Sequence, residues 1–226
     1  MTQALNNTGA DGVELDVQIT LDSVLVSFHE QDLNYSTNCT GCIPFMGLSD
    51  LENCTYVSSF PGPEHGLVNI GELLSQYDIS NPPYFSLDNK TALQCVGPDE
   101  ILEYLDRLAV TYQKAVAVAG RQDHVWIETQ AHELALGIKE LDPSIRVYWE
   151  SNDMPEGIEQ AVLLGCDGLV VSNDVVTAEM VKTAHELGLF VSIWQMSDRS
   201  SHIRAINKHP DHIQTDNISI ALDLLR

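Results

Sequence analysis

Basic residues are scarce in this chain. Its 226 residues include 33 Asp and Glu but only 11 Lys and Arg, which gives a formal net charge of −22. Such a charge argues against nucleic acid or an anionic membrane surface as the main partner, because both are themselves negatively charged. It fits a protein that binds cations, although most of the excess is typical of a solvated acidic surface.

Long apolar runs and a dinucleotide-binding motif are also missing. No uninterrupted apolar run approaches the roughly 18 residues of a transmembrane helix. No Gly-x-Gly-x-x-Gly follows any expected strand, which weakens a dinucleotide-binding fold. Hydrophobic residues make up 44% of the chain, which is enough for a core. We therefore expect residues 1–226 to form one domain of ordinary size.

Cysteines are few and odd in number, five in all. Cys39, Cys42 and Cys54 lie close together in a predicted loop insertion at about residues 34–66. One disulfide among them would staple that loop and imply an oxidising compartment, hence a periplasmic or secreted protein. The alternative is a zinc site with His65 as the fourth ligand.

The segment from Gly9 to Val17 predicts a strand with two carboxylates on one face. Side chains alternate across a strand, so Glu14 and Asp16 point the same way while the valines and the leucine between them point the other. A hairpin over residues 21–28 would return His29 toward this pair. Carboxylates and an imidazole around one divalent cation suggest metal-assisted hydrolysis.

The remainder of the chain alternates between expected strands and helices, a pattern typical of a parallel sheet. The expected strands cover residues 11–17, 84–88, 124–128, 145–149, 166–171, 189–194 and 212–215, with a short hairpin strand at 24–28. The expected helices cover residues 98–120, 131–141, 154–164 and 175–187. Seven parallel strands fit either an open doubly wound sheet or an eight-stranded barrel that lacks one strand.

Polar residues gather at the carboxyl ends of the expected strands. They are Asp16, Asp88, Lys90, Glu128, Glu150, Trp194 and Asp216. That distribution favours a (β/α)8 barrel of the TIM type, because such barrels carry their chemistry on this face.

Two motifs resemble the signature of the glycerophosphodiester phosphodiesterase family. They are GADGVELDVQ at residues 9–18, with its Glu-x-Asp pair, and LVSFHE at residues 25–30, where the family usually has His-Asp in place of His29-Glu30. LDNK at residues 87–90 is similar to the family's Glu-x-Lys strand, and VSIW at residues 191–194 to its Trp-bearing seventh strand. The resemblance covers essentially the whole chain and implies the TIM-type barrel.

One part of the family pattern does not occur. Family members begin with a strand ending in His-Arg-Gly, whereas this chain starts, at Gln3-Ala4-Leu5, where the family's first helix ends. We therefore expect a barrel without its first strand, lacking a second catalytic His and a phosphate-binding Arg. Such a segment is expected to be weakly active and to expose strand edges, and a version restored upstream is expected to be active.

The resemblance and the residue types together assign a cation site. Glu14, Asp16 and Asp88 are the expected ligands, although the family has Glu where this chain has Asp88. An all-oxygen set suits Mg²⁺ or Ca²⁺ rather than zinc. The alternative for Glu14 and Asp16 is salt bridges to basic neighbours, of which the chain has few. Lys90 is expected to bind a phosphate oxygen and to share negative charge as the P–O bond breaks; otherwise it is a surface lysine.

His29 is the expected acid/base residue, and the alternative is a histidine at the rim of the fold. Trp194 either covers the glycerol or the leaving alcohol, as the resemblance implies, or packs inside the barrel. Glu128 and Glu150 are either acids behind the ligands or exposed glutamates.

The expected function is metal-dependent hydrolysis of glycerophosphodiesters to glycerol 3-phosphate and an alcohol. One alternative is a phospholipase D-like lipid phosphodiesterase on the same barrel, with an apolar rim that residues 43–46 could form. The other is a non-catalytic barrel that binds a cation or phosphate, which the absent His-Arg-Gly favours.

Overall fold

The computed structural model describes residues 9–57, 65–77, 82–91 and 94–225. Gln3-Ala4-Leu5 and residues 58–64 of the predicted loop insertion lie outside the described residues. The strands are β1 (Gly12–Ile19), β2 (Leu25–Ser27), β3 (Val68–Asn69), β4 (Tyr84–Asn89), β5 (Val125–Thr129), β6 (Arg146–Ser151), β7 (Gly168–Ser172), β8 (Phe190–Trp194) and β9 (His212–Ile213).

Short helices precede β4, and from β4 onward the helices alternate with the strands. They are α2 (Leu48–Leu51), α3 (Ile70–Ser75), α4 (Ile101–Ala119), α5 (His132–Leu141), α6 (Met154–Leu164), α7 (Ala178–Glu186), α8 (Arg199–Ile206) and α9 (Ile218–Leu225), with 3-10 turns at Leu33–Tyr35 and Ile43–Phe45. The four predicted helices correspond to α4, α5, α6 and α7. The structure adds α2, α3, α8 and α9, which the sequence did not predict.

The strands form one sheet in the order β3-β2-β1-β4-β5-β6-β7-β8-β9. Pairing is parallel from β1 through β4 to β9, while β2 and β3 join antiparallel beside β1. All seven predicted parallel strands and the hairpin strand are present. The fold is an α/β fold of the TIM type, and within the described residues its sheet is open, with β3 and β9 at the edges.

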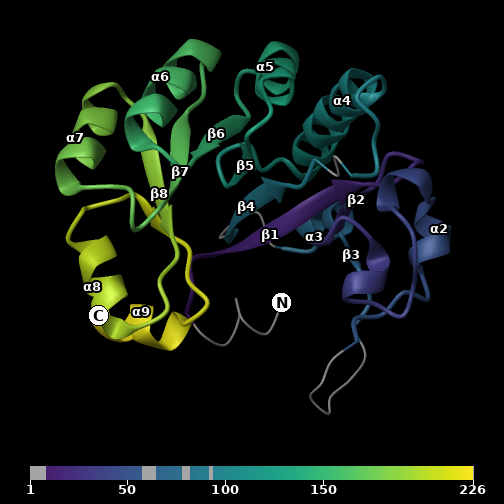
Figure 1. The fold of residues 1–226 in the computed structure, drawn as a ribbon, viewed down its shortest axis with the longest axis horizontal. Helices are drawn as coiled ribbons and strands as arrows, with labels where there is room; N and C mark the ends of the chain where they lie inside the picture. The colour runs from purple at the N-terminus through teal and green to yellow at the C-terminus, as the bar shows by residue number, and fades with distance from the viewer. Residues whose placement is uncertain (1–8, 58–64, 78–81, 92–93, 226) are drawn as a thin grey trace.

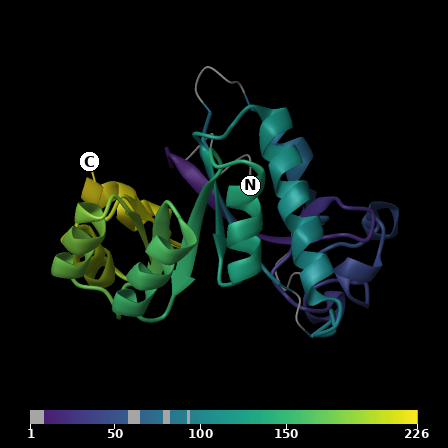
Figure 2. The same ribbon diagram turned by 90° about the horizontal axis from the view of Figure 1, so that it is seen from above.

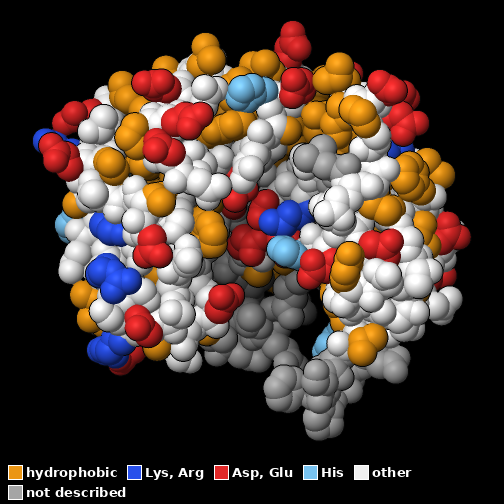
Figure 3. Space-filling view, in the orientation of Figure 1, with side chains coloured by type: hydrophobic (Ala, Val, Ile, Leu, Met, Phe, Trp, Pro, Cys, Tyr) orange, Lys and Arg blue, Asp and Glu red, His pale blue; other side chains and the backbone are white. Residues whose placement is uncertain are grey.

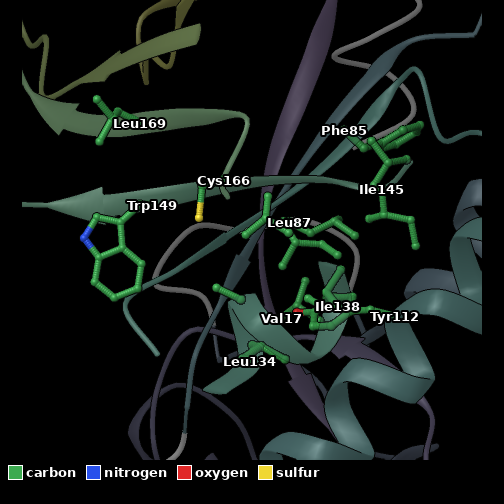
Figure 4. Close-up of a cluster of buried hydrophobic side chains, with 14 of the residues drawn as sticks. Val17, Phe85, Leu87, Tyr112, Leu134, Ile138, Ile145, Trp149, Cys166 and Leu169 are labelled. Carbon is green, nitrogen blue, oxygen red and sulfur yellow. The ribbon is translucent and has the colours of Figure 1, made fainter. Parts of the chain in front are cut away.

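β1 and β4 to β8 each have an apolar face toward the helices and a mixed face toward the interior of the curved sheet. In β1, Leu15, Val17 and Ile19 are buried in the main core, because side chains alternate along a strand. The helices α4 to α7 lie in an arc outside the strands (Figure 1). Figure 4 shows part of this core, where Leu87 of β4 and Ile138 of α5 pack together.

Aromatic rings fill the interior near the amino ends of the strands. The ring of Trp126 stacks on those of Tyr148 and His212, with centroids 5.3 and 4.4 Å apart. Gly168 makes room for this layer, since a Cβ there would lie 2.9 Å from the Tyr148 ring and 2.8 Å from the carbonyl oxygen of Phe190. The amino end of the interior is therefore packed, and the polar residues lie toward the other end.

Two disulfides hold the loop insertion. Cys39 pairs with Cys54, as predicted for this group of cysteines, and Cys42 pairs with Cys95, which follows β4. The zinc alternative is wrong, because Cys39, Cys42 and Cys54 are all consumed in disulfides. The segment that carries α2 lies on the α4 side of the sheet, far from α8 and α9 (Figure 2).

No helix among the described residues is both long enough and apolar enough to span a lipid bilayer.

Candidate active site

Three carboxylates from two neighbouring strands converge. One oxygen from each of Glu14, Asp16 and Asp88 lies within 4.8 Å of the others. The convergence follows from the sheet register: Asp16 of β1 is directly opposite Asp88 of β4, and Glu14 is two residues earlier on the same face. In Figure 3, acidic side chains surround a basic one in a hollow at the centre of the view, with a histidine beside them.

Lys90 pairs with two of these acids. Its backbone N–H donates to the carbonyl of Val17, which extends the β1–β4 pairing. Its Nζ lies 3.1 Å from Oδ1 of Asp16 and 2.5 Å from Oδ2 of Asp88. Burial lowers the pKa of Lys90, but the carboxylates of Asp88 and Asp16 outweigh this effect and raise it above its usual value. Lys90 is thus charged. Of the two acids for which a salt bridge was the alternative, Asp16 forms one, and Asp88 pairs with the same lysine.

Glu14 forms no salt bridge with the described part of the chain. Burial raises its pKa to about 8, and the negative charges of Asp16, Glu128 and Asp88 add to the shift. Within the described part of the chain, Oε1 of Glu14 and Oδ1 of Asp88 are buried without a hydrogen-bond partner. Two unpartnered carboxylate oxygens in an all-oxygen cluster fit a hard divalent cation such as Mg²⁺ or Ca²⁺.

The hairpin returns His29 alongside β1. The backbone N–H of Phe28 donates to the carbonyl of Asp16 at 3.0 Å. The imidazole is 63% exposed, and its Nδ1 lies 3.1 Å from Oε2 of Glu30. Burial raises the pKa of Asp88, while the charges of Lys90 and, to a smaller extent, His29 lower it. The imidazole therefore lies within electrostatic range of Asp88.

Contacts from the loop insertion and from the segment after β4 hold the chain on either side of His29. The Tyr56 hydroxyl donates to the carbonyl of Ser27 at 3.2 Å. The backbone N–H of Gln94 donates to Oε1 of Gln31 at 3.2 Å, next to the Cys42–Cys95 disulfide. Sequence reasoning missed these residues, because irregular segments carry no periodicity that would place them.

Trp194 ends β8, and Glu150 is the last residue but one of β6. Trp194 is partly buried and packs against Trp126, Tyr148 and Val170, so it contributes to interior packing. Burial and the charge of Asp88 raise the pKa of Glu150. Glu150 thus lies within electrostatic range of the carboxylate cluster without belonging to it.

Glu128 is not an exposed glutamate; only 2% of it is accessible. Its Oε1 accepts hydrogen bonds from the Ser86 hydroxyl, from Nε1 of Trp126 at 2.9 Å and from Nε2 of Gln214 at 2.5 Å. Burial raises its pKa to about 7, although the bonds from Ser86 and Trp126 lower it. These bonds join β4, β5 and the residue after β9 beside the carboxylate cluster, since Glu128 is directly opposite Asp88 in the sheet.

A TIM-type fold with an acidic cluster, a lysine and a histidine near the carboxyl ends of its first strands is typical of hydrolases that use a metal ion. The model of the glycerophosphoryl diester phosphodiesterase family matches residues 2–220. The chain belongs to this family and is a phosphoric diester hydrolase.

Solved structures agree on the fold. A Silicibacter pomeroyi protein assigned as a glycerophosphoryl diester phosphodiesterase superposes with a TM-score of 0.81 at 19% identity, covering 96% of this chain and 84% of that one. A glycerophosphodiester phosphodiesterase from Parabacteroides distasonis gives 0.78 at 18% identity, with coverage of 96% and 84%. An Oleispira antarctica phosphodiesterase in complex with the product sn-glycerol-3-phosphate gives 0.77 at 19% identity, with coverage of 96% and 86%. A search of curated protein sequences finds no significant match.

Proposed function

We propose that this protein hydrolyses glycerophosphodiesters to glycerol 3-phosphate and an alcohol, with Mg²⁺ or Ca²⁺ held by Glu14, Asp16 and Asp88. The observation that carries the proposal is the approach of these carboxylates to within 4.8 Å, with two of their oxygens buried and unpartnered in the described residues. The family and the product bound to the Oleispira antarctica relative support this substrate class. In this proposal, residues 1–226 act as one catalytic domain.

A divalent cation bound there would polarise the phosphodiester and offset its negative charge. Lys90 is placed to bind the same group. An ammonium has three N–H donors, and Asp16 and Asp88 accept two of them. The third can donate to a phosphate oxygen, so Lys90 would hold the phosphate and share the charge that develops during cleavage.

His29 would transfer the proton. Glu30 lies against Nδ1, which favours a hydrogen on that nitrogen and leaves Nε2 to face the substrate. A neutral Nε2 can accept a proton from the attacking hydroxyl or water, and a protonated one can donate to the departing alcohol oxygen. Trp194 would cover the leaving alcohol with the exposed part of its ring.

The phospholipase D-like alternative gains no support from the loop insertion. In the run at residues 43–46, Ile43 and Pro44 are buried, and only the Phe45 side chain is strongly exposed, at 55%. One exposed ring does not make an apolar rim for lipid chains. Glycerophosphodiesters are therefore the better supported substrates.

The test is release of glycerol 3-phosphate from glycerophosphocholine by the 226-residue chain, with Ca²⁺, with Mg²⁺ and with a chelator. Release that needs the cation and is lost in Asp16→Ala supports the proposal. The matched control is Asp106→Asn, an exposed acid on α4. No release, together with a cation-dependent rise in melting temperature that Asp16→Ala abolishes, would instead indicate a non-catalytic cation-binding barrel.

A further inference from the structure

We infer that Gln18 is the positioning residue for His29: its side chain clamps the backbone on both sides of the imidazole-bearing residue. The inference rests on the proposed function, in which His29 transfers the proton. Gln18 follows Glu14 and Asp16 on the interior face of β1 and is fully buried.

The clamp consists of two hydrogen bonds from one nitrogen. Nε2 of Gln18 donates to the carbonyl of Phe28 at 3.2 Å and to the carbonyl of Glu30 at 2.6 Å. A carboxamide nitrogen carries two hydrogens, so both are used. The two acceptors flank His29 directly, and fixing both carbonyls fixes the backbone from which the imidazole projects.

Regular backbone pairing does not hold this segment. The pairing of β1 with β2 ends at Ser27, and the N–H of Phe28 makes the last backbone bond to β1. In the described chain, the next backbone N–H that donates to another backbone carbonyl belongs to Leu33. Between these points the side chain of Gln18 supplies the connection to the sheet.

The clamp also links the proton-transfer residue to the cation site. Gln18 and Asp16 are two residues apart on one strand, so the same rigid element carries a proposed cation ligand and the support of His29. Catalytic groups must be held at a fixed separation, because small displacements cost large factors in rate.

A role in stability alone fits Gln18 poorly. Its Oε1 is buried without a hydrogen-bond partner in the described residues. Leaving a buried carbonyl oxygen unpartnered is unfavourable, and an apolar side chain of the same shape would avoid that loss. What an apolar side chain cannot supply is the pair of N–H donors.

The test compares Gln18→Met, which keeps the shape and removes both donors, with wild type and with His29→Ala. Gln18→Met is expected to lower kcat by about 10- to 100-fold with little change in KM. The cation-dependent rise in melting temperature should persist, since the carboxylates are untouched. Ile19→Val is the matched control, because it shortens a buried neighbour on the opposite face of the same strand. Gln18→Asn, too short to reach both carbonyls, decides the matter if Gln18→Met does not fold.

A second readout does not depend on turnover. In protein labelled with ¹³C-histidine, the His29 imidazole resonance, assigned with His29→Ala, should shift or broaden in the Gln18 variants and stay unchanged in Ile19→Val. A His29 resonance that is the same in wild type and in the Gln18 variants overturns the inference, whatever the activity. Wild-type kcat in the Gln18 variants beside an inactive His29→Ala overturns it while leaving the proposed function intact. Full activity in His29→Ala refutes the proposed role of His29 instead.

Discussion

The ammonium of Lys90 lies 3.1 Å from the carboxylate of Asp16 on the adjacent strand. The same ammonium pairs with Asp88, while Oε1 of Glu14 remains unpartnered in the described residues. A lysine in this place both orients the carboxylates and repels any second cation, so its removal should separate binding of the cation from catalysis.

Lys90→Met is expected to tighten divalent-cation binding by about tenfold, since one nearby positive charge is removed. The same change should lower kcat, because the third N–H of the ammonium no longer meets the phosphate. Calorimetric titration with Ca²⁺ or Mg²⁺ and steady-state kinetics would measure the two effects. Weaker cation binding in Lys90→Met would show that its orientation of Asp16 and Asp88 outweighs its repulsion.

Cation binding should depend on pH through Glu14. With its pKa raised to about 8 by burial and neighbouring acids, Glu14 carries a proton at neutral pH that a bound cation must displace. Affinity should therefore rise about tenfold per pH unit below pH 8 and level off above it. Glu14→Gln should flatten this dependence, whereas Asp106→Asn, a change at an exposed acid on α4, should retain it.

The raised pKa of Glu14 also makes the stability of the cation-free protein depend on pH. Between the ordinary value of 4.5 and about 8, the folded state binds more protons at Glu14 than the unfolded state does. Stability should therefore fall as pH rises through this window, and Ca²⁺ or Mg²⁺ should reverse the loss. Melting temperatures measured across pH with and without cation would show this, and a rise in stability with pH in the cation-free protein would contradict it.

His29→Gln should lower kcat by about 10²- to 10⁴-fold, the usual effect of removing one general acid or base. Because the imidazole is exposed, the melting temperature and its response to cation should change little. His65→Gln, at another exposed histidine, is the control. Comparable losses in both variants would remove His29 from the mechanism.

The two disulfides should differ in their effect on turnover. Cys42 and Cys95 are 53 residues apart and Cys39 and Cys54 are 15 apart, so loop closure predicts losses of about 4 and about 3 kcal/mol in unfolding free energy for the paired Ser variants. Only the Cys42→Ser/Cys95→Ser pair should also lower kcat. That disulfide joins the segment that follows His29 to the segment that follows Lys90. Chemical denaturation and kinetics on both double variants would test this.

The sequence predicts the sheet well because each strand alternates between the helix-facing core and the interior. That period of two identifies β1 and β4 and places Asp16, Asp88 and Lys90 on one face. The helical period of 3.6 does not reveal α8, because this short helix has few apolar residues. Its start is marked only by the capping side chains of Asp198 and Ser201.

The surroundings of the site were less predictable, since they depend on pairing between distant and irregular segments. Cys95 lies far along the chain from Cys42, and no local pattern joins them. Gln18 did carry a signal, as the next residue after Asp16 on the interior face, but its acceptors depend on how the hairpin turns. The scarcity of basic residues did not exclude salt bridges to the acids, because a single lysine pairs with two of them.

The Cys42–Cys95 link closes a covalent ring that contains β3, α3 and β4. A single nick in the backbone between Cys54 and Asp88 would place Glu14, Asp16 and His29 on one fragment and Asp88 and Lys90 on the other. The two fragments would nonetheless remain one molecule until a reductant separated them. Proteolysis inside this ring would therefore release no separate fragment on a non-reducing gel. The two halves of the carboxylate cluster would stay covalently linked.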